Sequence, residues 1–158
     1  MNWQEVCDNP ALQNLPYKME LNQQGQIIMS PASVMHVIFQ GKIMTLLNRY
    51  QQDCLVVPEF PVETHDGIKV VDVGLLTNPQ VARLQNNISA AFAPILCIEV
   101  LSPSNTQAEM ERKKELYFEK GAEEFWICDQ TGQMSFHDKS GELATSLLFR
   151  QFPKNINH

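Results

Sequence analysis

The sequence lacks the long apolar stretches and the cysteine patterns that mark membrane proteins and disulfide-rich domains. No apolar run approaches the roughly 20 residues that a membrane-spanning helix needs. The first residues, MNWQEVCDNP, lack the basic and then apolar pattern of a signal peptide. The four cysteines form no C-x-x-C pair, which favours core packing in a reducing compartment over a disulfide framework or a zinc site. We therefore expect a cytoplasmic protein that has no membrane partner.

Charged residues are also scarce, at 19% of the 158 residues, and the formal net charge is −6. Contacts with nucleic-acid phosphates need Lys and Arg. Any basic face must therefore be small, or be completed by an oligomer or a partner. The sequence has no phosphate-binding glycine loop, and its histidines lack the spacing of zinc ligands. Hydrophobic residues, at 44%, suffice for the core of one domain that spans 1–158.

The hydrophobic pattern predicts a mixed α/β (α+β) fold, in which helices flank a central mixed sheet and a β-hairpin lies at the N-terminus. The hairpin covers 16–30 and turns at Gln24-Gly25. The segment 30–33 then supplies the N-cap of an amphipathic helix at 34–50. The other predicted elements are strands at 54–60, 68–76, 94–102, 124–129 and 133–137, a short helix or loop at 78–88, a helix at 105–120 and a last strand near 146–150.

Three details of these elements can be tested against a structure. The strand at 94–102 is nearly continuous in apolar residues, which predicts a central strand that is buried on both faces. The helix at 105–120 is expected to begin with a capping box of Ser104 and Gln107 and to end before Gly121. The tail, 151–158, is expected to be loosely ordered.

Two acidic residues interrupt strands that are otherwise apolar, Asp72 in KVVDVGLL and Glu99 in ILCIEVL. A carboxylate buried there must be neutralised, paired or bound to a metal, because burying it alone costs many kcal/mol. Two converging carboxylates would repel each other unless a cation lay between them. Carboxylates together with water or phosphate oxygens are the ligands that Mg²⁺ prefers. Taken singly, each acid could instead lie at a strand end or edge with an Arg partner.

Lys113 and Tyr117 lie four residues apart on the predicted helix at 105–120, so they share a face. Leu116 and Tyr117 should face the core, which would turn Lys113 partly inward. A lysine beside a metal-bound water could orient that water or stabilise negative charge that develops at phosphorus. Spacing alone favours a simpler interpretation, in which residues 112–114 form a solvated basic run.

The stretches CIEVLSPSN and ERKKELYFEKGAEEFWICD resemble the bacterial restriction endonuclease family of the Uma type, once classed as a domain of unknown function. That family belongs to the PD-(D/E)XK nuclease superfamily. YKMELNQQGQIIMSPAS, followed by His36, resembles its N-terminal hairpin and first helix, and VVDVGLL resembles its Pro-Asp strand. The resemblance runs from about Tyr17 to Asp129 and implies a restriction-endonuclease-like core.

The resemblance implies a role for each matched residue. Asp72 matches the metal-binding Asp of the Pro-Asp motif, and Glu99 matches the second acid, which is also a metal ligand. Leu101 stands where the superfamily has its lysine. The work of that lysine is implied to pass to Lys113, which matches by its spacing to Tyr117.

Glu20 matches a recurrent acid of the family that supports the site, although by its own position it could equally be an exposed strand glutamate. Two positions depart from the family pattern. Val71 replaces the proline of the Pro-Asp motif, which should alter only the entry to the strand. Glu109 stands where relatives often have Asp.

The resemblance thus implies an endonuclease that hydrolyses DNA with Mg²⁺ or Mn²⁺ as its cofactor, and we expect a homodimer. Asp72, Glu99 and Lys113 would be catalytic, with the two acids as metal ligands. The Val100 carbonyl could be a further ligand, and Glu20 and Tyr117 would support the site. An alternative is a catalytically silent nucleic-acid-binding or interaction module that keeps the nuclease fold, which the acidic balance favours. A third is a structural protein with a buried ion network, which we rank last because such networks are often no better than apolar packing.

Overall fold

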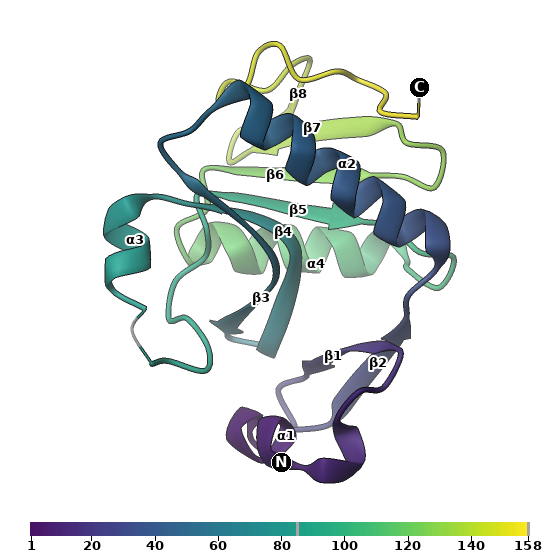
Figure 1. The fold of residues 1–158 in the computed structure, drawn as a ribbon, viewed down its shortest axis with the longest axis vertical. Coiled ribbons are helices and arrows are strands. Elements are labelled where there is room, and N and C mark those ends of the chain that lie inside the picture. Colours follow the sequence, from purple (N-terminus) through teal and green to yellow (C-terminus); the bar gives the residue numbers. More distant parts are fainter. Residues whose placement is uncertain (85, 158) are drawn as a thin grey trace.

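A computed structural model describes residues 1–84 and 86–157 of the chain (Figure 1). Gln85 of the predicted segment 78–88 and His158 of the predicted tail lie outside the described residues. Two strands, β1 (Tyr17–Leu21) and β2 (Ile27–Pro31), form an N-terminal hairpin. Six further strands form one mixed sheet in the order β3-β4-β5-β6-β7-β8. The structure therefore confirms the predicted fold class.

The sheet is antiparallel at every pair except β5 and β6, which run parallel and are connected through α4. Its strands are β3 (Leu55–Thr64), β4 (Gly67–Leu76), β5 (Leu96–Val100), β6 (Glu124–Cys128), β7 (Met134–Asp138) and β8 (Gly141–Leu143). The helices are α1 (Trp3–Asp8), α2 (Val34–Tyr50), α3 (Asn78–Ala82) and α4 (Gln107–Glu119), with a 3-10 turn at Pro10–Leu12. None of the described helices combines the length and the apolar character needed to cross a bilayer.

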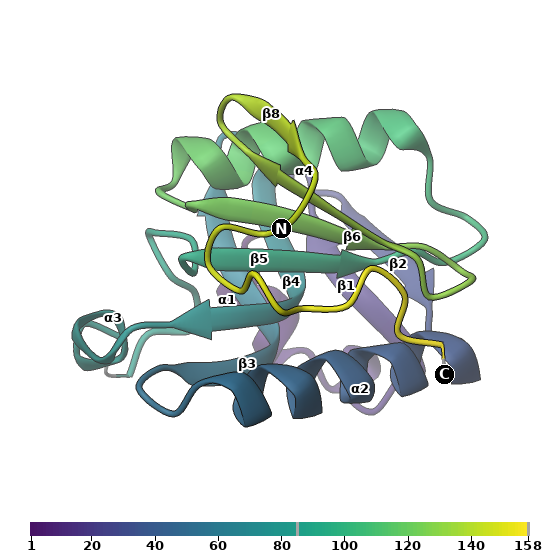
Figure 2. The same cartoon turned by 90° about the horizontal axis from the view of Figure 1, so that it is seen from above.

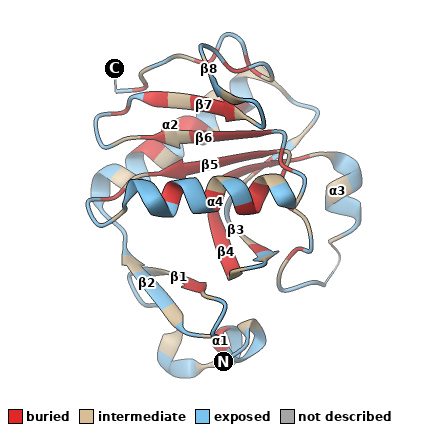
Figure 3. Ribbon diagram, turned by 180° about the vertical axis from the view of Figure 1, so that it is seen from behind, coloured by how far each residue is buried: buried red, intermediate tan, exposed pale blue. Residues whose placement is uncertain are grey.

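Helices α2 and α4 cover opposite faces of the sheet (Figure 2). On β5, Leu96 and Ile98 join the core beneath α2, whereas Cys97 joins the core beneath α4, which also contains Tyr117. Every residue of β5 is buried, and Figure 3 shows the buried strands between helices with exposed outer faces. The prediction of a central strand buried on both faces is confirmed.

The N-terminal hairpin has the predicted turn. Leu21 pairs with Ile27, and Gly25 has a φ of +76°, a conformation that glycine adopts at no steric cost. Ser33 caps α2, since its hydroxyl accepts a hydrogen bond from the His36 N–H at 3.0 Å. The hairpin packs with α1, a helix that the sequence patterns did not predict, against one end of β4, where Val70 contributes to a small apolar cluster (Figure 1).

The predicted start of α4 is wrong by two residues. Thr106 is the N-cap, and its hydroxyl accepts a hydrogen bond from the Glu109 N–H at 3.1 Å. Both S-x-x-Q and T-x-x-E fit the capping pattern, but Ser104 lies in a loop where Asn105 accepts hydrogen bonds from Ser102. At the other end, Gly121 follows the C-cap with a φ of +100°, as predicted.

The predicted strand near 146–150 is also wrong, because the last strand of the sheet is β8 at Gly141–Leu143. A tight turn after β7 lets the next residues pair with β7 immediately, as strand β8. The segment that follows β8 is held instead by Glu124, a buried carboxylate on β6. Glu124 accepts hydrogen bonds from the Ser146 hydroxyl and from the N–H groups of Leu147 and Leu148, at 2.7 to 2.9 Å.

The C-terminal segment differs from the expected loose tail. Phe152 and Ile156 are buried in the core beneath α2. The Ile156 N–H donates to the Gly132 carbonyl, and the Met134 N–H donates to the Lys154 carbonyl. Two large apolar side chains and a short run of backbone hydrogen bonds therefore hold this segment against the sheet.

Candidate active site

The two predicted acids lie where β4 and β5 separate. Backbone pairing between these strands ends at Val73 and Ile98. Asp72 precedes Val73 and Glu99 follows Ile98, so in an antiparallel pair both acids lie just beyond the same end of the ladder. Beyond this point the Val100 N–H donates to Asp72 Oδ2 at 2.8 Å. The acids are almost fully buried, and the structure brings them together.

Helix α4 supplies the predicted lysine and tyrosine. Lys113 Nζ lies 3.2 Å from Glu99 Oε1 and 3.0 Å from Glu20 Oε2. The Tyr117 hydroxyl donates to the same Glu99 Oε1 at 2.8 Å. Lys113 and Tyr117 are both buried, whereas the neighbouring Arg112 is exposed. Lys113 is therefore not part of a solvated basic run, because helical periodicity turns it toward the same face as Tyr117.

Glu20, on β1, also belongs to this cluster. Its side chain is buried, and Oε2 accepts a hydrogen bond from the Val70 N–H at 2.7 Å in addition to its ion pair with Lys113. Glu20 therefore ties the hairpin to β4 and holds the Lys113 ammonium in place. The alternative of an exposed strand glutamate is wrong.

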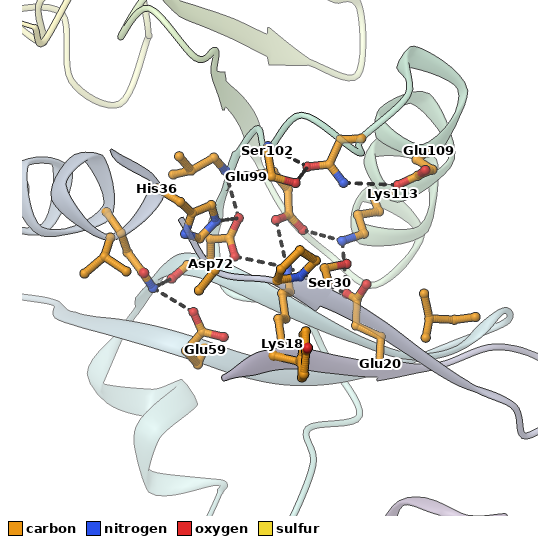
Figure 4. Close-up of a pocket in the computed structure, with 18 of the residues that line it drawn as sticks. Lys18, Glu20, Ser30, His36, Glu59, Asp72, Glu99, Ser102, Glu109 and Lys113 are labelled. Carbon is orange, nitrogen blue, oxygen red and sulfur yellow. Dashed lines mark hydrogen bonds and ion pairs between the residues drawn. The ribbon is translucent and has the colours of Figure 1, made fainter. Parts of the chain in front are cut away.

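Lys18, which the sequence patterns did not single out, stands between the acids (Figure 4). Its ammonium lies 3.0 Å from Asp72 Oδ1, 3.3 Å from Glu99 Oε2 and 3.9 Å from Glu20 Oε2. Strand alternation is the signal that could have found it, because residues 18 and 20 lie on the same face of β1. A site that includes Glu20 therefore has Lys18 as a neighbour.

A second set of residues packs against Asp72 from the side of α2. His36 Nε2 lies 3.3 Å from Asp72 Oδ2. The Gln40 side-chain amide donates to the Asp72 backbone carbonyl at 2.7 Å and to Glu59 Oε1 at 2.9 Å. Glu59 of β3 lies opposite Asp72, between the backbone pairs Pro58–Val73 and Phe60–Val71, and has a φ of +50°, which is unusual for a residue other than glycine. The sequence gives no local signal for this backbone conformation.

The charges of the cluster shift its pKa values strongly. Burial disfavours the Lys18 ammonium, but the carboxylates of Glu99, Asp72 and Glu20 outweigh burial and hold its pKa well above its ordinary range. Burial likewise opposes ionisation of Asp72, yet the Lys18 charge and the His36 hydrogen bond hold the pKa of Asp72 far below its usual range. Burial raises the pKa of Glu99 to about 7, against the opposing charges of Lys113 and Lys18.

Two remaining polar partners of the acids, Tyr117 and His36, have raised pKa values. Burial, and the charge of Glu99 beside it, raise the pKa of Tyr117 well above its ordinary value, so its hydroxyl remains a hydrogen-bond donor. The hydrogen bond to Asp72 raises the pKa of His36, while burial lowers it. Asp72 is therefore the fixed anion of the pair, and Glu99 is the acid whose charge can change near neutral pH.

The floor of a pocket of about 280 Å³ that opens to solvent is formed by the charged side chains of Lys18, Glu20, Asp72, Glu99 and Lys113. Figure 4 shows the carboxylates and ammonium groups converging from the hairpin, β4, β5 and α4. Part of the rim is apolar and includes Leu15, Tyr17, Ile28 and Val37. The pocket thus combines a charged floor with an apolar edge.

The donor set fits a hard divalent cation. Three carboxylates, of Glu20, Asp72 and Glu99, face two ammonium groups, so the floor carries a surplus of negative charge when Glu99 is ionised. The Lys18 ammonium shows that a cation can lie between Asp72 and Glu99. In residues 1–84 and 86–157 no three His, Cys, Asp or Glu side chains are arranged to hold a metal ion. A bound ion would therefore complete its ligands with water or substrate oxygens, as Mg²⁺ usually does.

The mixed sheet between two helices, with an acid pair and a helix-borne lysine where two strands separate, defines a nuclease-like α/β protein. The model of the Uma2 family, described as "Putative restriction endonuclease", matches residues 3–151. The chain belongs to this family. The match is longer than the stretch from Tyr17 to Asp129 that carries the sequence resemblance.

A solved structure has the same fold. It is the crystal structure of a protein from Anabaena variabilis ATCC 29413, described as "a putative nuclease belonging to DUF820". The two structures are similar with a TM-score of 0.70 and 19% sequence identity, over 87% of this chain and 79% of that chain. No curated protein matches the chain.

Proposed function

We propose that the protein is a Mg²⁺- or Mn²⁺-dependent endonuclease that hydrolyses phosphodiester bonds in DNA. The observation that carries this proposal is the convergence of Asp72 Oδ1 and Glu99 Oε2 on one cationic group at the floor of an open pocket. Membership of a family described as restriction endonucleases supports the same reaction class.

In this proposal Asp72 and Glu99 bind the ion, with the Val100 carbonyl as a further ligand. The ion would lower the pKa of a bound water and polarise the scissile phosphate. Lys113, held at the pocket by Glu20 and Glu99, would donate to the phosphate oxygen on which charge develops. Tyr117 would keep the Glu99 carboxylate in its orientation through its short hydrogen bond.

Cleavage of supercoiled plasmid DNA tests the activity. We expect the wild type to nick the plasmid with Mn²⁺ or Mg²⁺ and to stop when the ion is chelated. Asp72→Asn and Glu99→Gln should abolish nicking, and Lys113→Met should slow it by about a hundredfold. Arg112→Met is the matched control, since Arg112 is the exposed neighbour of Lys113 and pairs with Glu115. Nicking that persists in Glu99→Gln would contradict the assignment.

Thermal unfolding tests the metal site without relying on activity. Millimolar Mn²⁺ should raise the melting temperature of the wild type by mass action, because the ion binds the folded state. Glu99→Gln should remove that rise. If no divalent ion shifts the wild type, the metal site is wrong.

A second candidate function is a catalytically silent nucleic-acid-binding or interaction module that retains the fold. The net charge of −6 and the pairing of both pocket lysines with carboxylates favour it. Fluorescence anisotropy with labelled DNA separates the two functions. Binding that needs no divalent ion, by a protein that never cuts, would support the silent module.

We also propose that the protein is a homodimer. Several apolar side chains of the hairpin and of the start of α2 are exposed: Tyr17, Ile28, Met29, Val34, Met35 and Val37. Exposed apolar groups that gather on one part of a surface often mark an interface. Light scattering at the elution peak tests this proposal, and a monomeric mass at micromolar concentration would contradict it.

A further inference from the structure

Lys18 stands where two acids from different strands would otherwise face each other. Its ammonium touches Asp72 Oδ1 and Glu99 Oε2 at 3.0 and 3.3 Å. Lys113 is placed differently, because its ammonium contacts the other carboxylate oxygen of Glu99, Oε1, and also contacts Oε2 of Glu20. Among the described residues, Lys18 is the ammonium group that joins Asp72 to Glu99.

We propose that Lys18 is an internal counter-cation, which occupies the metal position between Asp72 and Glu99 and must leave it when a divalent ion binds. This inference rests on the proposed metal site. An ion that coordinates both facing oxygens lies about 2 Å from each of them, and the same oxygens are hydrogen-bonded to the ammonium. Two cations cannot share such a position, because their positive charges would repel each other strongly at this short distance.

The placement of Lys18 gives the ammonium a route out. Its side chain is 14% exposed, whereas those of Asp72 and Glu99 are 2% exposed. Lys18 therefore reaches the acids from the solvent side, and it also lines the open pocket. A lysine side chain is long and flexible, so its ammonium can swing into the pocket while the backbone of β1 stays in place.

The backbone that carries Lys18 is held independently of the ammonium. Glu20, two residues further along β1, accepts a hydrogen bond from the Val70 N–H at 2.7 Å and pairs with Lys113 at 3.0 Å. Loss of the Lys18 ammonium should therefore leave the hairpin docked on β4. The competition is confined to one side chain and one cation position.

A consequence is that the protein binds divalent ions more weakly than its acids would allow. When a binding-competent arrangement is only fractionally populated, the apparent affinity falls by that fraction. Replacing Lys18 with an uncharged side chain of similar length should make the metal position permanently available.

Isothermal titration with Mn²⁺ tests the competition on the full-length wild type, Lys18→Met and Lys113→Met. We expect Lys18→Met to bind Mn²⁺ at least about tenfold more tightly than the wild type. Lys113→Met removes an equal charge from the same Glu99 carboxylate but does not clear the position, so its gain should be about threefold or less. Equal gains in the two variants would overturn the inference, because they would indicate a general charge effect.

The outcomes also separate this inference from the proposed function. If the wild type and Lys18→Met bind Mn²⁺ equally, the metal site stands and the counter-cation role is wrong. If neither binds, and Lys18→Met is folded by circular dichroism, the metal site and the inference both fail. Binding by Lys18→Met alone would support the counter-cation role but would contradict the proposed metal dependence of the wild type.

A second measurement needs no variant at the metal position. In wild-type protein labelled with ¹⁵N-lysine, the Nζ resonance of Lys18 should shift as Mg²⁺ saturates the site, because its two carboxylate partners are lost. The resonance of Lys69, whose ammonium pairs with Asp66 at 3.4 Å, is the control and should stay in place. A Lys18 resonance that does not move at saturating Mg²⁺ would rule out displacement.

Discussion

The backbone N–H of Val100 donates to the carboxylate of Asp72 at 2.8 Å, just beyond the last backbone pair between β4 and β5. Asp72 thus supplies a hydrogen-bond acceptor where the ladder has ended, while its other oxygen faces Lys18. A residue that is proposed to bind metal is therefore also part of the sheet, and its replacement has a structural cost.

Asp72→Ala should be more destabilising than Asp72→Asn. Alanine leaves the Val100 N–H without its partner and removes the nearest carboxylate from the Lys18 ammonium, which should lower the free energy of unfolding by about 3 kcal/mol. Asparagine keeps an acceptor for the Val100 N–H, so Asp72→Asn should lower the free energy of unfolding by clearly less than Asp72→Ala does. Urea denaturation of the metal-free proteins measures both values. Equal losses would show that the hydrogen bond contributes little.

Glu99 should give the protein a pH-dependent stability near neutrality. Its pKa is raised by burial to about 7 from an ordinary value of 4.5. Because the folded-state value is the higher one, the contribution of Glu99 is complete below pH 4.5 and is lost as the pH rises through about 7. We expect the free energy of unfolding of the wild type, relative to Glu99→Gln, to fall by about 3 kcal/mol at most over this range.

Urea denaturation of the two proteins at a series of pH values, without divalent ions, provides the measurement. Glu99→Gln is the reference because it keeps the shape of the side chain and cannot ionise. A difference between the proteins that stays constant across the range, or that grows in favour of the wild type as the pH rises, would contradict the expected direction.

Tyr117→Phe should remove one donor from Glu99 and leave the ring packing intact. The loss should be about 1 kcal/mol in the free energy of unfolding. The pKa of Glu99 should rise further, because the hydroxyl stabilises the ionised carboxylate. Tyr50→Phe is a suitable control, since Tyr50 packs edge-on against Phe152 through its ring. We expect that control to differ from the wild type by less than about 0.5 kcal/mol.

Glu124 provides the contrast of a buried acid with a purely structural role. It accepts hydrogen bonds from the Trp126 indole, the Ser146 hydroxyl and two backbone N–H groups, and it does not line the pocket. Glu124→Ala should cost about 3 kcal/mol of stability, because all these donors lose their acceptor. Its melting temperature should still rise with Mn²⁺ as the wild type does. Loss of that rise in a folded Glu124→Ala protein would show that the two sites are coupled.

Local sequence patterns were enough to single out two residues of the candidate site. Asp72 and Glu99 stand out because a charged residue in an apolar strand is unusual wherever the strand lies. Lys113 was assigned through the family resemblance, because its spacing to Tyr117 alone favoured a solvated basic run. Local patterns also predicted the hairpin, the two long helices and the buried central strand.

The rest of the site depends on contacts between distant segments. Lys18 reaches Asp72 only because the hairpin docks beside β4, and the unusual backbone conformation of Glu59 occurs opposite Asp72 on the neighbouring strand. The strand predicted near 146–150 failed for a related reason. Glu124, more than 20 residues earlier in the chain, determines where Ser146 and its neighbours lie.

The docking of the hairpin has a consequence for how the molecule assembles. Lys18 and Glu20 come from a segment that precedes α2, whereas Asp72, Glu99 and Lys113 come from the sheet and α4. Without the hairpin, Asp72 and Glu99 would share a single ammonium, that of Lys113, and their repulsion would oppose closure of the core around them. Docking of the hairpin places the Lys18 ammonium between the two acids, so this docking and the closure of the core stabilise each other. A chain that misplaces its hairpin would leave the two acids facing each other at the point where β4 and β5 diverge.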